Sequence, residues 1–220
     1  SNSISSIAGA QHLTGVTNMS LRFNSISDLS PLSGLTNLTD LSLRSNNITD
    51  ISDLSGLTNL DYLNLDSNSV SDLSILSGLT NLATLYLFGN NFSDSELNNL
   101  PTSLTYLDLG NNSITDLSPL SVLTNLTHLR LTWNSITDIS DLSVLTNLNS
   151  LDLGSNSGIS DFSVLSGLTN LTSLNLWNTN LGNSDLTHIS GLTSLTRLYL
   201  EINNITDLSS LSVLTNLQYF

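Results

Sequence analysis

Residues 35–56 read LTNLTDLSLRSNNITDISDLSG, and residues 57–78 repeat the pattern as LTNLDYLNLDSNSVSDLSILSG. Each segment is 22 residues long and contains the triplet Leu-x-Leu. Along the chain the triplets recur six times at intervals of 22 residues, then at 23 and 24. A fixed internal period predicts stacked copies of one structural unit around a continuous core. The triplets are Met19/Leu21, Leu41/Leu43, Leu63/Leu65, Leu85/Leu87, Leu107/Leu109, Leu129/Leu131, Leu151/Leu153, Leu174/Leu176 and Leu198/Leu200.

The alternation in Leu-x-Leu predicts a short, half-buried strand in each repeat, with the leucines inward and the x residue outward. Equivalent strands then lie side by side in a parallel sheet, about 4.8 Å apart. We expect Leu41, Leu43, Leu63, Leu65, Leu107 and Leu109 to be buried.

A second pattern predicts short helices on the outer side of each repeat. In seven repeats an aspartate stands immediately before an L/I/F-S-x-L/V segment, and Asp94 stands before Ser-Glu-Leu at the same point of its repeat, which is where a helix N-cap belongs. These segments are short, so we expect three-ten or single-turn helices, with longer ones in residues 92–104 and 181–195. The predicted capping residues are Asp28, Asp50, Asp72, Asp94, Asp116, Asp138, Asp161 and Asp207.

An asparagine follows the second strand leucine by three residues in every repeat except one, where Thr179 takes its place. Because an amide side chain both donates and accepts, stacked asparagines can satisfy the backbone groups exposed where the chain leaves each strand. We expect Asn46, Asn68 and Asn90 to be buried and bonded to the backbone.

These repeats resemble leucine-rich repeats, and segments such as LTNLTDLSLRSNNITDISDLSGL (35–57) and LTYLDLGNNSITDLSPLSVL (104–123) resemble the internalin family of bacterial surface proteins. The resemblance implies an α/β fold: a leucine-rich repeat solenoid curved as a horseshoe, with a parallel sheet on the concave face and short three-ten or α-helical turns on the convex face. In that family the concave sheet binds a host or matrix protein. The resemblance therefore implies a non-enzymatic recognition module that is extracellular or attached to the cell surface.

The period also predicts the domain organisation. Residues 1–220 are expected to form a single domain of about nine full repeats, with partial repeats at both ends. Asn2, Ile4 and Ile7 occupy positions of an earlier repeat, and the chain closes within one at LTNLQYF (214–220), where Phe220 is expected in the core. Because solenoid ends require caps, we expect further repeats or capping domains at both ends.

Composition excludes several classes of partner and chemistry. Eighteen acidic residues stand against four arginines and no lysine, and the net charge of −14 repels phosphate backbones and anionic lipid. Nucleic acid is therefore excluded as a partner. No apolar run reaches the roughly 18 residues that a membrane helix needs, so membrane insertion is not expected. The chain has no cysteine and no glycine-rich phosphate loop, so no cofactor is expected.

The positions around the strand leucines carry the chain's variable side chains. All five tyrosines, both tryptophans and all four arginines lie there. These residue types supply most of the binding energy at protein interfaces, although Asp108, Arg130 and Asp152 could also form only an ion-pair ladder. The candidate ligand-binding residues are Tyr62, Tyr86, Phe88, Tyr106, His128, Arg130, Trp133, Trp177, Arg197 and Tyr199.

Catalysis and metal binding are weakly supported. Asp108, His128 and Ser150 lie on successive predicted strands, but an open sheet face offers neither an oxyanion hole nor exclusion of water. The aspartate column could bind calcium, yet a hydrophobic residue follows every aspartate of the column except Asp94, which favours capping. We therefore predict no catalytic residue, no metal ligand and no enzyme activity.

Two functions remain. The first is binding of a protein ligand across the concave sheet. The second is binding of a regular surface such as ice or a polysaccharide, or a structural contact in an adhesin, through the recurring threonine of the LTNL segments. Those threonines are Thr36, Thr58, Thr80, Thr124, Thr146, Thr169 and Thr215.

Overall fold

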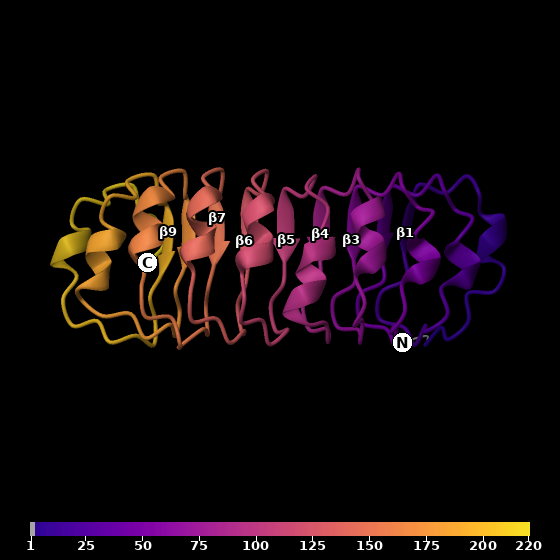
Figure 1. The fold of residues 1–220 in the computed structure, drawn as a ribbon, viewed down its shortest axis with the longest axis horizontal. Helices are drawn as coiled ribbons and strands as arrows, with labels where there is room; N and C mark the ends of the chain where they lie inside the picture. Colours follow the sequence, from indigo (N-terminus) through magenta and orange to yellow (C-terminus); the bar gives the residue numbers. More distant parts are fainter. Residues whose placement is uncertain (1–2) are drawn as a thin grey trace. The chain divides into compact units, whose positions relative to one another are not determined.

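The computed structural model describes residues 3–220, so Asn2 lies outside the described part of the chain. The residues gather into two compact units, one ending at Asn112 and the other beginning at Ser113. In each unit a three-residue strand alternates along the chain with a short three-ten helix (Figure 1). The strands are β1 (Asn18–Ser20), β2 (Asp40–Ser42), β3 (Tyr62–Asn64), β4 (Thr84–Tyr86), β5 (Tyr106–Asp108), β6 (His128–Arg130), β7 (Ser150–Asp152), β8 (Ser173–Asn175) and β9 (Arg197–Tyr199). The three-ten helices are η1 (Ala10–His12), η2 (Ser30–Leu32), η3 (Ser52–Leu54), η4 (Ser74–Gly78), η5 (Asp94–Asn99), η6 (Ser118–Val122), η7 (Ser140–Val144), η8 (Ser163–Gly167), η9 (Asp185–His188) and η10 (Ser209–Leu211).

The strands of each unit pair in parallel and in sequence order. β1 to β5 pair in this way in the first unit, and β6 to β9 in the second. The register sets strand leucines side by side, for example Leu41 beside Leu63 and Leu85 beside Leu107. All six strand leucines expected to be buried have 0% exposed surface. The predicted combination of parallel strands and short three-ten turns is confirmed.

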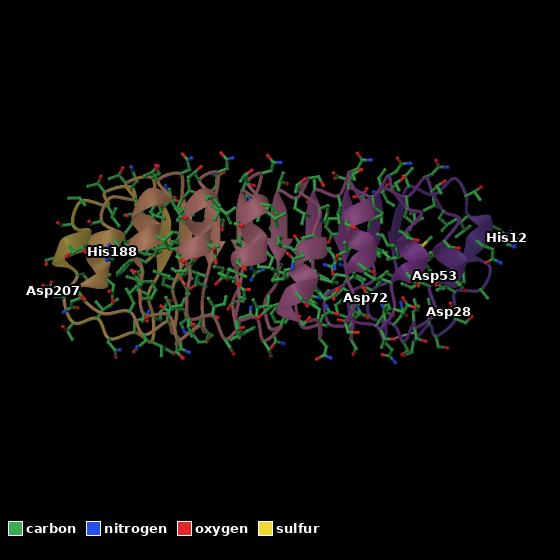
Figure 2. All side chains as sticks on the ribbon, viewed as in Figure 1. His12, Asp28, Asp53, Asp72, His188 and Asp207 are labelled. Atoms are coloured by element: carbon green, nitrogen blue, oxygen red, sulfur yellow. The ribbon has the colours of Figure 1, made fainter. Side chains whose placement is uncertain are left out.

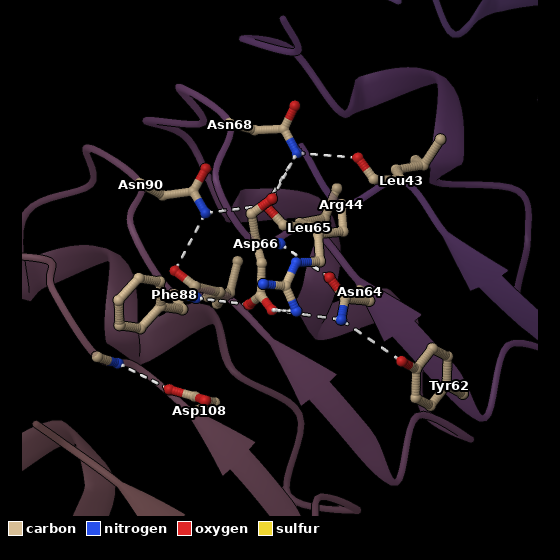
Figure 3. Close-up of polar contacts among 12 residues, drawn as sticks. Leu43, Arg44, Tyr62, Asn64, Leu65, Asp66, Asn68, Phe88, Asn90 and Asp108 are labelled. Atoms are coloured by element: carbon tan, nitrogen blue, oxygen red, sulfur yellow. Dashed lines mark hydrogen bonds and ion pairs between the residues drawn. The ribbon is translucent and has the colours of Figure 1, made fainter. Parts of the chain in front are cut away.

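Within each unit, asparagines that follow the strands bond a repeat to the one before it, as Figure 3 shows for Asn68 and Asn90. The Nδ2 of Asn68 donates to the carbonyl of Leu65 in its own repeat at 3.0 Å and to that of Leu43 in the preceding repeat at 3.1 Å. Its Oδ1 accepts the N–H of Ile48 at 3.0 Å. One side chain thus satisfies three backbone groups in two repeats, as predicted.

The asparagine ladder differs from expectation in its burial. Asn46 is 8% exposed, but Asn68 and Asn90 are only half-buried, so burial is confirmed for one of the three. Where Thr179 replaces asparagine, its Oγ1 donates to the carbonyl of Leu176 at 2.9 Å. The N–H of Thr179 is bonded to the Oδ1 of Asn203 at 3.0 Å. The ladder therefore continues through the substituted repeat.

The aspartates act one residue earlier than predicted. The N-cap of η2 is Leu29, and Asp28 precedes it, with its Oδ1 accepting the N–H of Ser30 at 2.9 Å. Leucine follows the aspartate because it enters the core, so the carboxylate reaches forward across it to the first helical residue. Asp94 is the exception, since it is the first residue of η5 rather than a residue before it. The same bond to the serine two residues later is made by Asp50, Asp72, Asp116, Asp138, Asp161 and Asp207.

The bonds to serine hold the pKa of these seven carboxyl groups below the ordinary value of 3.8. At Asp28 the serine hydroxyl is the larger cause and the N–H the second, and at the other six the N–H comes first. Both donors favour the charged carboxylate. Because the folded pKa is depressed, the stabilisation is present above the unfolded pKa and is lost as the pH falls through the folded pKa.

We therefore expect a pH-dependent difference between the wild-type chain and an Asp72→Asn/Asp138→Asn variant, which keeps the acceptor oxygens but removes the charge. The wild-type chain should be the more stable at pH 7, and the difference should shrink as the pH falls through the lowered folded pKa values, until the folded and unfolded carboxyl groups are both protonated. Urea unfolding at pH 7 and at a series of lower pH values measures it. Comparing the two chains cancels most of the general relief of charge repulsion on acidification, and a difference that persists at low pH would contradict this account.

Two further expectations are corrected, one about the length of a helix and one about the burial of Phe220. Residues 92–104 hold η5, whose six residues make it the longest helix in residues 3–220, but residues 181–195 hold only the four-residue η9. Phe220 is 65% exposed rather than in the core, since none of the residues 3–220 covers it. Within residues 3–220 no helix has the length and apolar character needed to cross a bilayer.

Candidate functional site

The strand face of each unit consists of the outward side chains immediately before, between and after the two strand leucines of each repeat. In the first unit, three tyrosines from successive strands form a row on this face. The ring centroids of Tyr62 and Tyr86 lie 5.6 Å apart, and those of Tyr86 and Tyr106 lie 4.7 Å apart. Tyr86 sits on the central of the three strands and is diagonal to both neighbours in the register. All three rings are half-buried, because each covers part of the next.

The ionisation of Tyr86 is suppressed. Burial raises the pKa of its hydroxyl, and hydrogen bonding to Tyr106 raises it further. The hydroxyl therefore stays protonated to a higher pH than that of an ordinary tyrosine, and as a phenol it can both donate and accept. Phe88 is half-buried on the same unit, and its N–H donates to the Oδ1 of Asp66 at 2.9 Å (Figure 3).

In the second unit, two tryptophans form a separate aromatic pair. Trp133 and Trp177 meet edge to face, with ring centroids 6.5 Å apart and an interplanar angle of 85°. Trp133 is 51% exposed, while Trp177 is half-buried. The packing of Trp133 against Trp177 was not visible in the repeat pattern, because the two residues occupy different positions of repeats that are not adjacent.

The remaining candidates lie on the strand face of the second unit. His128 is exposed, and its Nδ1 is 2.9 Å from the Oγ1 of Thr127. Arg130 is exposed, with its Nε 3.7 Å from the Oδ2 of Asp152. Arg197 is also exposed and lies 5.4 Å from the ring centroid of Tyr219, while Tyr199 is half-buried.

Two acidic residues of the strand face are buried, which the sequence did not predict. Asp66 is 5% exposed and Asp108 is 3% exposed. The Oδ1 of Asp108 accepts the N–H of Gly110 at 3.0 Å, and Asp66 bonds to the N–H of Phe88. The available signal was the spacing Asp-Leu-Gly at 108–110, because an aspartate between the strand leucines can fold over the strand end and accept the N–H two residues later.

Comparison with known proteins supports a shared architecture. Family models described as "Leucine rich repeat" and "Leucine Rich repeats (2 copies)" match residues 14–70 and 36–92, and residues 102–144, respectively. Among solved structures, the chain is similar to an internalin (inlF) of Listeria monocytogenes at 36% identity and a TM-score of 0.72, covering 99% of this chain and 77% of that one. Internalin C2 of the same species is 31% identical with a TM-score of 0.65, over 96% of this chain and 83% of that one.

A leucine-rich repeat protein of Leptospira interrogans is 26% identical with a TM-score of 0.74, over 96% of this chain and 61% of that one. No curated protein matches the sequence. The chain belongs to the leucine-rich repeat family. Within this family it resembles the internalins, as the 22-residue repeats predicted.

A column of left-handed residues follows the strands of this leucine-rich repeat chain, two residues after each second strand leucine. We call this the exit position. Every exit residue has φ between 52° and 64°, a region that favours glycine and asparagine. Six of the nine exit residues in the described chain are serine, asparagine or glycine, and the other three are Phe23, Trp133 and Ile202. They are 61%, 51% and 68% exposed.

These three bulky residues pay a conformational cost without the burial that would offset it. A left-handed conformation costs an L-residue about 1 to 2 kcal/mol, and strained residues of this kind concentrate at functional sites. Phe23 lies 5.7 Å from the guanidinium carbon of Arg44, and Trp133 contacts Trp177. The exit position therefore adds Phe23 and Ile202 to the candidates predicted from the sequence.

Replacing Ile202 by asparagine should stabilise the leucine-rich repeat domain, because asparagine tolerates the left-handed conformation and already fills the exit position as Asn111 and Asn178. We expect the melting temperature to rise by about 2 to 4 °C for each kcal/mol of strain removed. Val213→Asn is the matched control, since Val213 is an exposed β-branched residue with negative φ, and it should bring no gain. A lower melting temperature for Ile202→Asn than for wild type would show that Ile202 is kept for packing.

The catalytic alternative gains no support from the geometry of this leucine-rich repeat chain. Asp108 is buried at the end of its strand, where it bonds to the N–H of Gly110, whereas His128 is exposed and bonded to the hydroxyl of Thr127. Neither contact is one that a Ser-His-Asp triad uses. Among residues 3–220, no group of three or more histidines and acidic residues could hold a metal ion.

Proposed function

We propose that this leucine-rich repeat chain is a non-enzymatic recognition module that binds a protein ligand through the strand faces of its two units. The observation that carries the proposal is the row formed by Tyr62, Tyr86 and Tyr106, whose rings contact one another and remain partly open to solvent. Rings already packed together lose little freedom on binding, which favours affinity. The proposed ligand-binding residues are Tyr62, Tyr86, Phe88, Tyr106, His128, Arg130, Trp133, Trp177, Arg197 and Tyr199.

The location that fits this function is the cell surface or the extracellular space. The resemblance to internalins supports it, and so does the composition, because a chain with a net charge of −14 and no lysine is a poor partner for nucleic acid. The rest of the proposal concerns the ends of the chain, where we expect further repeats or capping domains to cover the terminal repeats.

A displayed library of cell-surface ectodomains tests the protein-binding function. The library is screened in parallel with wild type, with a Tyr86→Ala/Tyr106→Ala variant, and with Ser55→Ala, which alters an exposed serine beside η3. We expect ectodomains that bind wild type and Ser55→Ala equally and lose binding to the double variant. Ectodomains that bind all three chains equally would contradict a site on the strand face of the first unit.

A second candidate function rests on the threonine column of the LTNL segments. All seven threonines are exposed. In six of these repeats the asparagine after the threonine bonds to the preceding repeat; for example, the Nδ2 of Asn59 donates to the carbonyl of Thr36, and that of Asn81 donates to the carbonyl of Thr58. A regular array of this kind suits ice or another regular surface.

Thermal hysteresis of the purified chain separates the two functions. Protein recognition predicts no hysteresis. Hysteresis that disappears in a Thr58→Trp/Thr80→Trp variant but persists in Tyr86→Ala/Tyr106→Ala would place the regular-surface function first.

A further inference from the structure

Positive charge is confined to the strand faces and is exposed there. All four arginines of the chain lie on these faces, and each is exposed. Five acidic residues share the faces, but among them only Glu201 is exposed in the described chain, since Asp66 and Asp108 are buried and Asp40 and Asp152 are half-buried. The other acidic residues lie outside the strand faces, in parts of the chain that contain no arginine and no lysine. The arginines are Arg22, Arg44, Arg130 and Arg197.

Carboxylates on the strand faces point away from solvent because they accept hydrogen bonds from backbone N–H groups. The Oδ1 of Asp66 accepts the N–H of Phe88 at 2.9 Å, and its Oδ2 lies 3.4 Å from the Nδ2 of Asn64 (Figure 3). The Oδ1 of Asp152 accepts the N–H of Gly154 at 3.0 Å. The first bond turns the carboxylate of Asp66 toward the next repeat, and the second folds that of Asp152 over the end of its own strand, so both are drawn away from solvent.

The guanidinium groups beside these carboxylates stay outward. The Nη1 of Arg44 is 3.9 Å from the Oδ2 of Asp66, and the two side chains are 49% and 7% exposed. For Arg130 and Asp152 the separation is 3.7 Å, and the exposed fractions are 45% and 16%. Both separations exceed hydrogen-bond distance. Because the arginine of each ion pair is much more exposed than the aspartate, a ligand approaching the strand face would contact the guanidinium group.

We propose that the ligand of the strand faces is a protein surface that presents aspartate and glutamate carboxylates beside apolar or aromatic side chains. This inference rests on the proposed function and adds the chemistry of the partner. Arginine forms a planar fork that binds carboxylates with two parallel bonds. The tyrosine row and the tryptophan pair supply the apolar part of the contact. Elsewhere the surface is acidic, as at Asp28 and Asp72 on the side of the first unit that bears the three-ten helices (Figure 2), so it repels an acidic partner.

A dense polyanion such as a sulfated polysaccharide fits this surface less well. Arg22 and Arg44 lie in neighbouring repeats, but Arg130 and Arg197 belong to repeats well separated in sequence, with aromatic and small side chains between them. A highly charged polymer would gain few arginine contacts and would meet the net charge of −14. A protein surface with a few carboxylates between apolar groups avoids most of that repulsion.

The test uses a displayed library of one small folded domain with a randomised surface patch, selected against wild type and against an Arg44→Gln/Arg130→Gln/Arg197→Gln variant. Glutamine keeps most of each side-chain stem and removes its charge. We expect binders of wild type to contain about threefold more Asp and Glu relative to Lys and Arg than unselected clones, and binders of the variant to show no such excess. Unchanged melting curves confirm that the variant is folded, and immobilised heparin is the probe for polyanion binding.

The outcomes separate two claims: that the strand faces bind a protein, and that this protein presents carboxylates. Clones whose binding depends on Tyr86 and Tyr106 but which carry no acidic excess would overturn the charge inference and leave the proposed function standing. Clones that bind without any dependence on either strand face would overturn both. Arginine-dependent binding of heparin without acidic binders in the library would replace the protein partner by a polysaccharide.

Discussion

Replacing Asn156 by alanine should lower the free energy of unfolding by about 3 kcal/mol or more. Asn156 is 1% exposed. Its Nδ2 donates to the carbonyls of Leu131 at 2.9 Å and Leu153 at 2.8 Å, and its Oδ1 accepts the N–H of Ile136 at 3.2 Å. Alanine would leave these groups in a buried place without that partner, and each orphaned group costs about 1 to 3 kcal/mol. Urea unfolding followed by circular dichroism measures the loss.

Two matched variants define the cause of that loss. Asn156→Thr copies the side chain that the chain uses at Thr179, which still donates to a strand carbonyl, so it should cost less than alanine. Asn68→Ala removes the same set of bonds at a half-buried position, where water can replace part of them, and should cost about 1 to 3 kcal/mol. A loss of only a few tenths of a kcal/mol for Asn156→Ala would show that the ladder does not stabilise the fold.

Replacing Tyr86 by alanine should weaken binding of the protein ligand by about 2 kcal/mol or more, which corresponds to roughly a 30-fold rise in Kd. Tyr86 lies between Tyr62 and Tyr106, so its removal breaks both ring contacts at once. Surface plasmon resonance with an ectodomain recovered from the library measures the change.

Tyr86→Phe is the control for this variant, because it keeps the ring and removes only the hydroxyl. It should retain most of the affinity, and Ser55→Ala should retain all of it. Melting curves of the variants exclude a general loss of structure. Equal affinity for wild type and Tyr86→Ala would remove the tyrosine row from the binding site, while the fold would be unaffected.

The repeat pattern predicted the fold well because the same physical requirement recurs in every repeat. Each strand leucine must enter the core, and each strand end must have its backbone groups satisfied, so Leu63 and Asn68 could be assigned from spacing alone. The aspartate position was missed by one residue, since the pattern places Asp28 before η2 but does not show that Leu29 is the N-cap.

The candidate site was less predictable because it depends on contacts that do not follow the period. The repeat positions identified Tyr86 and Trp133 as outward, but the pairing of Trp133 with Trp177 depends on side-chain packing. The burial of Asp66 depends on a bond to the next repeat, and the strain at Ile202 depends on a backbone angle. None of these is encoded by residue type at a fixed spacing.

The structure of the chain bound to an ectodomain recovered from the library tests the central claim most directly. We predict that atoms of the ligand lie within about 4 Å, the usual contact distance, of Tyr86 and Tyr106 in the first unit or of Trp133 and Trp177 in the second. A ligand that contacts only the side bearing the three-ten helices, leaving these rings in solvent, would contradict it.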